Sequence, residues 1–260
     1  MKLVQSRDNP FFKELRRLVE SGRERRKAGL TVLDGAHLVR AYEEAVGPVR
    51  TLVVSAHGLQ NPEIAALASG REAVELADGL FRELGTVDTP SGILAVVPLP
   101  DVVQEPDPGV DTVVLDGIQD PGNVGTLLRT AAAAGFRQVA LSGDCAAVWS
   151  PKVLRAGQGA HFTLAISENA DLAAYLAGFR GGVAVTCLAG ASSLYETPLD
   201  SPLAWVFGSE GQGVRPEVAA TATARVRIPM PGQVESLNVG AAAAVCLFET
   251  VRRRLEVKGA

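Results

Sequence analysis

The chain has 260 residues, 47% of them hydrophobic and 21% charged, which is enough for one large domain or two ordinary ones. The formal net charge of −4 argues weakly against a generally basic nucleic-acid-binding protein. No apolar run is long enough to cross a bilayer, and the N-terminus has charges and a proline where a signal peptide needs an apolar segment. We therefore expect a soluble, cytoplasmic protein with no membrane partner.

The basic residues are concentrated at the N-terminus. Residues 1–30 carry nine Lys or Arg and four Asp or Glu, which leaves a local excess of five positive charges. Local phosphate binding needs a basic surface of this kind, and a solvated helix face is the alternative interpretation. The candidate phosphate-binding residues are Arg16, Arg17, Arg23, Arg25, Arg26 and Lys27.

Residues 1–97 alternate between helix and strand patterns. Pro10 opens a helix that has apolar residues at helical spacing. Further helices are expected at residues 36–47 and 62–69, and strands at residues 30–35, 49–55 and 91–99. Strands separated by helices predict a small α/β domain with a largely parallel sheet.

Residues 98–111 contain four prolines and several acidic residues, which indicates a semi-rigid linker before a second domain at 112–260. Strands are expected there at residues 112–115, 138–141, 162–165, 182–186, 203–207 and 225–228. Helices are expected at residues 125–134, 151–155, 170–177, 216–220 and 237–253. These strands are almost continuously apolar, which is typical of a parallel sheet buried on both faces. Ligands of such sheets bind beyond the carboxyl ends of the strands.

The sequence contains few of the residues that usually bind metal ions, with three cysteines and three histidines. Cys145, Cys187 and Cys246 are odd in number and far apart, so no disulfide framework or metal-binding pair is visible. The histidines show no ligand spacing either. We expect three buried or half-buried thiols and no metal ion.

Three glycine-containing loops follow strands of the second part. Their sequences are DPGNVG at 120–125, FGSEGQG at 207–213 and IPMPGQVESLN at 228–238. The first precedes an alanine-rich helix, but its glycines fit neither the G-x-G-x-x-G nor the P-loop pattern. Taken singly, each loop is ordinary turn chemistry.

Together and in this order, NVGTLLRTAAAAGF, FGSEGQG and IPMPGQVESLNVGAAAAV resemble the three motifs of the SpoU, or TrmH-like, family of RNA ribose 2′-O-methyltransferases. NPFFKELRRL and TVLDGAHLVRAYEEA are similar to the N-terminal substrate-binding domain of that family. The resemblance implies a small N-terminal α/β RNA-binding domain over residues 1–97, with the candidate phosphate-binding residues as its RNA contacts. It also implies a C-terminal α/β knot domain over residues 112–260, trefoil-knotted and with a mostly parallel sheet. It further implies a homodimer with the active site near the subunit interface.

The resemblance implies an enzyme that transfers a methyl group from S-adenosyl-L-methionine to a ribose 2′-OH in structured RNA. Ribosomal RNA is favoured over tRNA as the substrate, because in the family a separate N-terminal domain of this type usually accompanies ribosomal RNA substrates. A tRNA 2′-O-methyltransferase and a non-catalytic RNA-binding protein of the same fold are the alternatives. A Rossmann dehydrogenase, the third alternative, would need the G-x-G-x-x-G spacing that is missing.

By resemblance, the catalytic residues are Arg129, Asn123, Glu210, Ser236 and Asn238. In the family the arginine is commonly proposed to take the 2′-OH proton, but a guanidinium is essentially always protonated. Binding the adjacent RNA phosphate and stabilising the developing alkoxide is the alternative role for Arg129. Asn123 is expected to position Arg129 or an RNA group, with a turn-forming asparagine as the alternative. Glu210 is expected to orient either Arg129 or its own loop by accepting hydrogen bonds. Ser236 and Asn238 begin the last helix, where they cap its N–H groups, line the RNA site, or both.

The cofactor is expected to contact Gly208, Ile228 and Leu237, chiefly through main-chain groups. The alternative is that Ile228 and Leu237 are core residues. Further cofactor candidates are Met230, Gly211, Leu188, Ala189 and Gly190. Two positions depart from the family. Gly240 stands where the family commonly has a serine, which removes a hydroxyl near the substrate or the partner subunit, and Asp34 stands where related N-terminal domains often have a glutamate.

Overall fold

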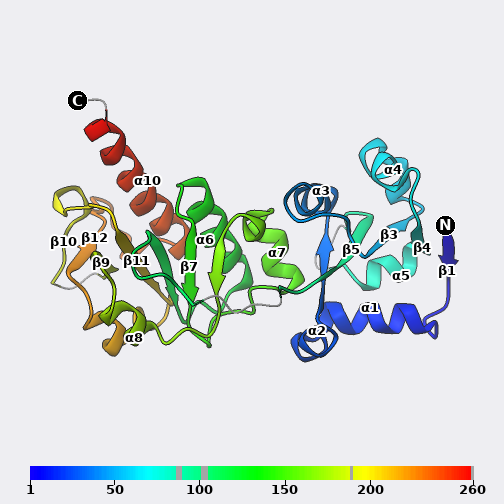
Figure 1. Cartoon of the computed structure of the whole chain (residues 1–260), viewed down its shortest axis with the longest axis horizontal. Coiled ribbons are helices and arrows are strands. Elements are labelled where there is room, and N and C mark those ends of the chain that lie inside the picture. The colour runs from blue at the N-terminus through cyan, green and yellow to red at the C-terminus, as the bar shows by residue number, and fades with distance from the viewer. Residues whose placement is uncertain (86–89, 101–104, 188–189, 259–260) are drawn as a thin grey trace. The chain divides into compact units, whose positions relative to one another are not determined.

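The computed structural model describes residues 1–85, 90–100, 105–187 and 190–258 (Figure 1). The chain forms two compact units. Unit 1 contains Met1–Val102 and Trp149–Phe162, and unit 2 contains Val103–Val148 and Thr163–Ala260. The segment at 149–162 thus groups with unit 1, whereas the sequence-based boundaries assign it to the second domain. The functional division of the chain stays a prediction.

The sheet of unit 1 is mixed, and the expectation of a largely parallel sheet is wrong here. Its strand order is β1 (Lys2–Val4), β4 (Ala73–Leu76), β3 (Thr51–Ser55), β5 (Ile93–Pro98) and β2 (Leu30–Asp34). Strand β5 lies between β2 and β3 and runs antiparallel to both, while β4 is parallel to β1 and β3. The sequence patterns missed β1 and β4, which are only three and four residues long.

The helices of unit 1 follow local signals. They are α1 (Pro10–Glu20), α2 (Gly22–Ala28), α3 (Ala36–Ala45), α4 (Pro62–Ala68), α5 (Asp78–Glu83) and α7 (Pro151–Gly157). The side chain of Asn9 accepts a hydrogen bond from the N–H of Phe11, and Pro10 occupies the first turn of α1. Helix α1 then buries Phe12, Leu15 and Leu18 in the core of unit 1. The helix expected from this apolar spacing is confirmed.

Helix α7 completes the core of unit 1 from a distant part of the sequence. Leu154 is fully buried in a cluster with residues of α3, β3 and β5. Arg155 forms an ion pair of 2.8 Å with the buried carboxylate of Asp34 on β2. The hydroxyl of Thr31 donates a 2.7 Å hydrogen bond to the carbonyl oxygen of Trp149. These contacts explain why the segment belongs to unit 1.

Unit 2 contains a fully parallel sheet of seven strands. Their order is β10 (Ser192–Ser193), β12 (Ala224–Arg227), β9 (Gly182–Thr186), β11 (Leu203–Gly208), β6 (Thr112–Asp116), β7 (Gln138–Leu141) and β8 (Ala165–Ser167). The central strands are almost entirely buried, which explains their continuous apolar runs. The strand expected at residues 162–165 is displaced to β8, because residues 160–162 form a 3₁₀ turn.

Two pairs of helices cover the two faces of this sheet (Figure 1). They are α8 (Leu172–Ala177) with α9 (Pro216–Ala219), and α6 (Pro121–Ala133) with α10 (Val239–Lys258). Val206 packs in one cluster with residues of α8 and α9. The preceding residue, Trp205, points to the opposite face of the sheet. Its indole N–H donates a 3.0 Å hydrogen bond to the Thr250 hydroxyl of α10. Within the described ranges, no helix has the length and apolarity needed to span a membrane.

Two arginines of α10 hold Glu249 and the segment that follows β10. Arg252 and Arg253 donate hydrogen bonds of 2.7–2.9 Å to the Glu249 carboxylate. The pKa of Glu249 is lowered to about 2, and the hydrogen bonds from Arg252 contribute most to this shift. The hydrogen bond from Arg253 acts in the same direction. Arg253 also donates to the carbonyl oxygens of Leu194 and Thr197. The last helix is therefore tied to a distant loop of unit 2 through these side chains.

We expect this ion-pair cluster to make stability depend on acid pH. A pKa that is lower in the folded than in the unfolded protein stabilises the fold above the unfolded value of about 4.3, and this stability is lost as pH falls toward the folded pKa of about 2. Urea unfolding of the wild type and of Glu249→Gln at pH 7, 5 and 3 tests this. The variant should be less stable at pH 7 and lose less stability between pH 5 and pH 3. Parallel pH profiles of the two proteins would contradict the assignment.

Candidate active site

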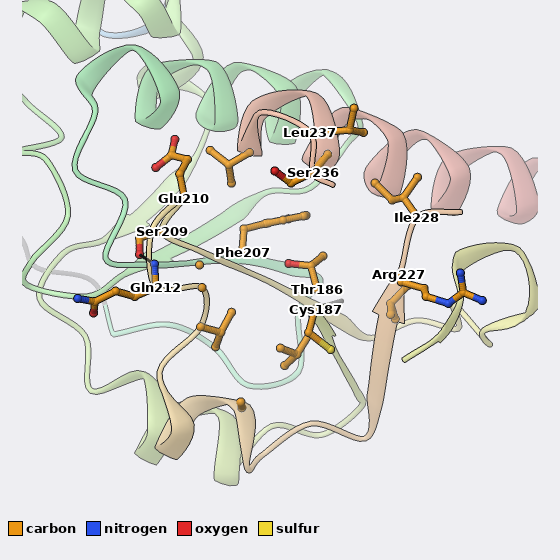
Figure 2. A pocket seen from close by; sticks show the side chains of 18 of the residues that line it. Thr186, Cys187, Phe207, Ser209, Glu210, Gln212, Arg227, Ile228, Ser236 and Leu237 are labelled. Atoms are coloured by element: carbon orange, nitrogen blue, oxygen red, sulfur yellow. Dashed lines mark hydrogen bonds between the residues drawn. The ribbon is translucent and has the colours of Figure 1, made fainter. Parts of the chain in front are cut away.

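A pocket of about 760 Å³ lies beyond the carboxyl ends of β9, β11 and β12 in unit 2 (Figure 2). Its walls come from the end of β9, the loop after β11, the loop after β12 and the start of α10. The position is the one that parallel α/β sheets use for ligands. The volume lies within the range of about 300–1,000 Å³ that is typical of small-molecule sites.

The pocket has apolar walls with a few polar groups. Figure 2 shows Phe207, Ile228 and Leu237 among its side chains, with Thr186 and Ser236 on the same cavity. Ile228 is half-buried and Leu237 is 39% exposed, so neither is a fully buried core residue. Apolar walls with a small number of polar groups fit a ligand that has both an aromatic ring and polar substituents.

Five of the eight expected cofactor residues line this pocket: Gly208, Gly211, Ile228, Met230 and Leu237. Gly190 lines a separate pocket of about 400 Å³. Leu188 and Ala189 lie outside the described residues. The sequence interpretation missed other lining residues, among them Thr186 and Phe207. Both lie at the carboxyl end of an expected strand, a position that could have identified them.

Glycine is required at position 208 because the backbone of the following loop approaches it closely. A Cβ atom at this position would lie 2.1 Å from the carbonyl carbon of Gly213 and 2.2 Å from the backbone nitrogen of Val214. The loop folds back because the Gly213 N–H donates a 2.8 Å hydrogen bond to the Ser209 carbonyl oxygen. The sequence interpretation explained Gly208 by the approach of a ligand. In the structure, the close neighbour is the backbone of the same loop.

Three of the expected catalytic residues meet at the rim of the pocket: one from the first turn of α6, one from the loop after β11 and one from the residue just before α10. The Asn123 side-chain NH₂ donates a hydrogen bond to Glu210, and its oxygen accepts a 3.0 Å hydrogen bond from the Asn238 side-chain NH₂. The Asn123 backbone N–H donates a 2.8 Å bond to Asp120, the N-cap residue of α6. One amide therefore joins the α6 loop, the loop after β11 and the start of α10.

Asn238 has one of the two roles that the sequence left open, because it caps the last helix. Its side-chain oxygen accepts hydrogen bonds from the backbone N–H groups of Gly240 (2.9 Å) and Ala241 (3.3 Å), which caps the N-terminus of α10. Its NH₂ group is the one that binds Asn123. Ser236 lies just before this cap and lines the pocket (Figure 2).

Arg129 lies on the exposed side of α6, six residues after Asn123. In the described structure Glu210 accepts a hydrogen bond from Asn123 and not from Arg129, which fits the role of orienting its loop. Within the described part of the chain, the Arg129 guanidinium makes no hydrogen bond or ion pair with another residue. Its donors therefore face solvent and are available to an anionic ligand.

The departure at Gly240 has a packing explanation. A Cβ atom at Gly240 would lie 3.0 Å from the Thr126 methyl carbon on α6 and 3.1 Å from the Asn238 side-chain oxygen. Thr126 thus fills space that the family's serine would need where α6 and α10 pack together.

We expect Gly240→Ser alone to destabilise the protein by about 1–3 kcal/mol through overpacking. Thr126→Ala should remove most of this cost when the two substitutions are combined, because it removes the facing methyl group. Urea unfolding of the wild type, both single variants and the double variant measures the coupling. Additive effects would show that Thr126 is not the residue that excludes a serine.

The basic residues of α1 and α2 fall into two groups. Arg16, Arg17, Arg23, Arg26 and Lys27 are exposed, and Arg16 pairs with Glu20 at 2.8 Å. Arg25 is buried, and its guanidinium donates hydrogen bonds of 2.9 and 3.1 Å to the carbonyl oxygens of Leu18 and Val19. The RNA-binding assignment of Arg25 is therefore wrong, because its charge satisfies carbonyl groups at the end of α1.

The three cysteines have the expected environments. Cys246 is buried and Cys145 and Cys187 are half-buried. Burial raises the pKa of Cys246 to about 12 and also raises the pKa of Cys145. Among the residues that the structure describes, no group of three or more His, Cys, Asp or Glu side chains could hold a metal ion.

Family models match both parts of the chain. The SpoU rRNA Methylase family matches residues 111–248, and the MRM3-like substrate binding domain matches residues 9–95. A curated relative, the 23S rRNA (guanosine(2553)-2′-O)-methyltransferase RlmP of Bacillus subtilis, is 30% identical over 251 residues. That alignment covers 95% of this chain and 98% of the relative.

Solved structures agree with these matches over nearly the whole chain. An RNA 2′-O ribose methyltransferase superposes with a TM-score of 0.86 at 30% identity, covering 97% of this chain and 99% of that one. An rRNA methyltransferase of Sinorhizobium meliloti with AdoMet bound gives a TM-score of 0.81 at 28% identity, covering 97% and 98%. The resemblance and the fold class expected from the motifs are thereby confirmed. The chain belongs to the SpoU family of RNA ribose methyltransferases and carries an MRM3-like substrate-binding domain before its methylase domain.

Proposed function

We propose that this protein transfers a methyl group from S-adenosyl-L-methionine to a ribose 2′-OH of structured RNA, with ribosomal RNA as the substrate. The observation that carries the proposal is the Asn123–Glu210–Asn238 network at the rim of the pocket, close in sequence to the exposed Arg129. The relative that acts on 23S rRNA covers nearly the full chain, which favours ribosomal RNA over tRNA. A non-catalytic RNA-binding protein would need neither the network nor the pocket.

The residues that line the pocket fit S-adenosyl-L-methionine. Ile228, Leu237 and Phe207 supply apolar contacts for an adenine ring, and the loops at Gly208 and Met230 offer backbone polar groups. A solved neighbour of the same fold contains AdoMet. When bound, the cofactor supplies an electrophilic methyl group on a positively charged sulfur.

The side chains around the pocket bind and align the RNA. Arg129 presents a planar, permanently charged guanidinium that binds a phosphate next to the target ribose and stabilises negative charge on the 2′-oxygen. Asn123 is held from both sides by Glu210 and Asn238, which keeps three loops in fixed relation. Such preorganisation lowers the entropic cost of aligning the hydroxyl with the methyl group.

The proposal assigns a separate function to each part of the chain. Residues 1–97 form the RNA-binding domain, residues 98–111 the linker and residues 112–260 the trefoil-knotted methyltransferase domain. The exposed basic residues Arg17, Arg23, Arg26 and Lys27 on α1 and α2 support phosphate binding by the first domain. A cytoplasmic location follows from an rRNA substrate.

We also propose a homodimer, because α10 exposes large apolar side chains. Phe248 is 48% exposed and Leu255 is 64% exposed, and their spacing of seven residues places them on one side of the helix. The family to which the chain belongs is typically homodimeric.

Phe248→Glu is expected to convert the dimer to a monomer, because it introduces a charge into the apolar contact. Light scattering coupled to size-exclusion chromatography measures the mass. Val46→Glu, at a 60% exposed apolar residue of unit 1, is the matched control and should leave the dimer intact. A monomeric wild type, or a dimer that survives Phe248→Glu, would overturn this part of the proposal.

The decisive experiment maps 2′-O-methyl groups in ribosomal RNA from a strain that lacks the gene and from its parent. We expect one or more ribose methyl groups to be lost, and to be restored by the wild-type gene but not by a gene carrying Arg129→Ala. Unchanged rRNA maps with a change in tRNA would favour the tRNA alternative. Unchanged maps of both RNAs would support the non-catalytic alternative.

A further inference from the structure

The carboxylate of Asp116 lies beneath the site. Asp116 is the last residue of β6, and in the sheet it lies opposite Gly208, the last residue of β11. Its side chain has 0% solvent exposure. A buried carboxylate is costly unless it is paired and hydrogen-bonded. The partners of Asp116 are therefore structurally significant.

Among the residues that the structure describes, the hydrogen bonds to the Asp116 carboxylate come from Arg215. The Arg215 backbone N–H donates a 2.8 Å hydrogen bond to one carboxylate oxygen, and Nε donates a 2.7 Å bond to the other. The Nη2 atom also lies 2.7 Å from this second oxygen. The two residues are 99 positions apart, so the pair joins the end of β6 to the chain that follows β11.

The chain between Gly208 and Arg215 is a compact loop held at both ends. It closes on itself through the Gly213 N–H, which donates to the Ser209 carbonyl, and through the Gln212 N–H, which donates a 3.2 Å bond to the Ser209 hydroxyl. Strand β11 fixes its first end and Asp116 fixes its last. The loop carries Glu210, the hydrogen-bond partner of Asn123.

Asp116 also stands at the start of the chain that carries Asn123. Residues 117–120 lead directly from β6 to the N-cap of α6, and Asn123 lies in the first turn of that helix. The Asp116–Arg215 pair thus joins the two loops at their base, and the Asn123–Glu210 hydrogen bond joins them at their tip.

We propose that Asp116 and Arg215 are positioning residues for methyl transfer, which hold the Ser209–Val214 loop so that Glu210 meets Asn123 and the pocket wall keeps its shape. The inference rests on the function proposed above. Without the ion pair, the loop loses the anchor at its second end, and Glu210 is no longer held against Asn123. The same displacement moves Gly211 in the wall of the cofactor pocket.

The kinetic test compares Arg215→Gln, Glu210→Ala and the double variant for kcat and for KM of S-adenosyl-L-methionine. We expect Arg215→Gln to reduce kcat/KM by about 10–100-fold, the size of effect seen when the partners that orient a binding group are removed. If Arg215 acts through Glu210, its loss in the Glu210→Ala background should reduce kcat by no more than about 3-fold. Losses that multiply in the double variant would overturn the positioning role.

A second measurement needs no cofactor or RNA. Amide hydrogen exchange at Gly213 should accelerate in Arg215→Gln, because its N–H closes the loop. Arg180→Gln, which breaks an exposed ion pair with Asp107 elsewhere in unit 2, is the matched control and should leave exchange at Gly213 unchanged. Unchanged exchange in Arg215→Gln would overturn the inference.

Two conservative variants keep the inference testable if Arg215→Gln does not fold. Asp116→Asn keeps the shape of the side chain and an acceptor for the Arg215 backbone N–H, so it should show a smaller change in the same direction. Arg215→Lys keeps the charge and should restore part of the lost kcat/KM. If the wild type neither binds S-adenosyl-L-methionine nor methylates RNA, the proposed function fails, while the exchange measurement still decides whether Asp116 and Arg215 hold the loop.

Discussion

Replacing Arg129 by alanine is expected to reduce methyl transfer by at least about 100-fold, the cost of removing one group that stabilises charge in a transition state. The affinity for S-adenosyl-L-methionine should stay within about 2-fold, because Arg129 is not among the residues that line the pocket. Single-turnover transfer of a labelled methyl group to ribosomal RNA measures the first effect. Isothermal titration calorimetry with the cofactor measures the second.

Two variants sharpen the result for Arg129. Arg129→Lys keeps the positive charge but loses the planar fork, so an intermediate rate would identify bidentate phosphate binding as its contribution. Arg137→Ala removes an exposed arginine just after α6 and should leave turnover unchanged. Near-normal turnover by Arg129→Ala would remove this residue from the site.

We expect Gly208→Ala to raise the dissociation constant for S-adenosyl-L-methionine by more than about 10-fold. Overpacking costs about 1–3 kcal/mol of stability, and here the strain falls on the loop that forms the pocket wall. The added methyl group would meet three backbone atoms at 2.1–2.4 Å, and backbone cannot move aside as the end of a flexible side chain can. The Ser209–Val214 loop must shift, and with it the wall of the pocket and Glu210. Cofactor titration and the unfolding midpoint should be measured together.

Gly232→Ala is the matched control, because it adds the same methyl group to an exposed loop residue that is not among those lining the pocket. A Cβ atom at Gly232 has no heavy atom within 4 Å, so binding should change by less than about 2-fold. Equal affinities of Gly208→Ala and Gly232→Ala would show that the close approach of Gly213 to Gly208 does not shape the pocket.

The loop signals in the sequence located most of the candidate site. Glycine and asparagine after apolar strands identified the walls of the pocket, because the carboxyl ends of parallel strands share one edge of the sheet. Asn123, Glu210 and Asn238 were each selected by motif, and they form one hydrogen-bonded network. For Glu210 the structure selects one of the two contacts that the motif left open, since motif spacing carries no information about which of two nearby side chains a carboxylate contacts.

Local sequence patterns predicted the family, five strands of the parallel sheet and most of the helices. Those features depend on periodicity, capping residues and turn chemistry within short windows. The tertiary structure decided the rest: helix α7 in unit 1, the mixed sheet of unit 1, the burial of Arg25 and the pairing of Asp116 with Arg215. Most of these depend on contacts between residues far apart in the chain, and even the short-range contact of Arg25 depends on how α2 turns back on α1. No local pattern specifies which carboxylate or carbonyl group an arginine will meet once the chain has folded.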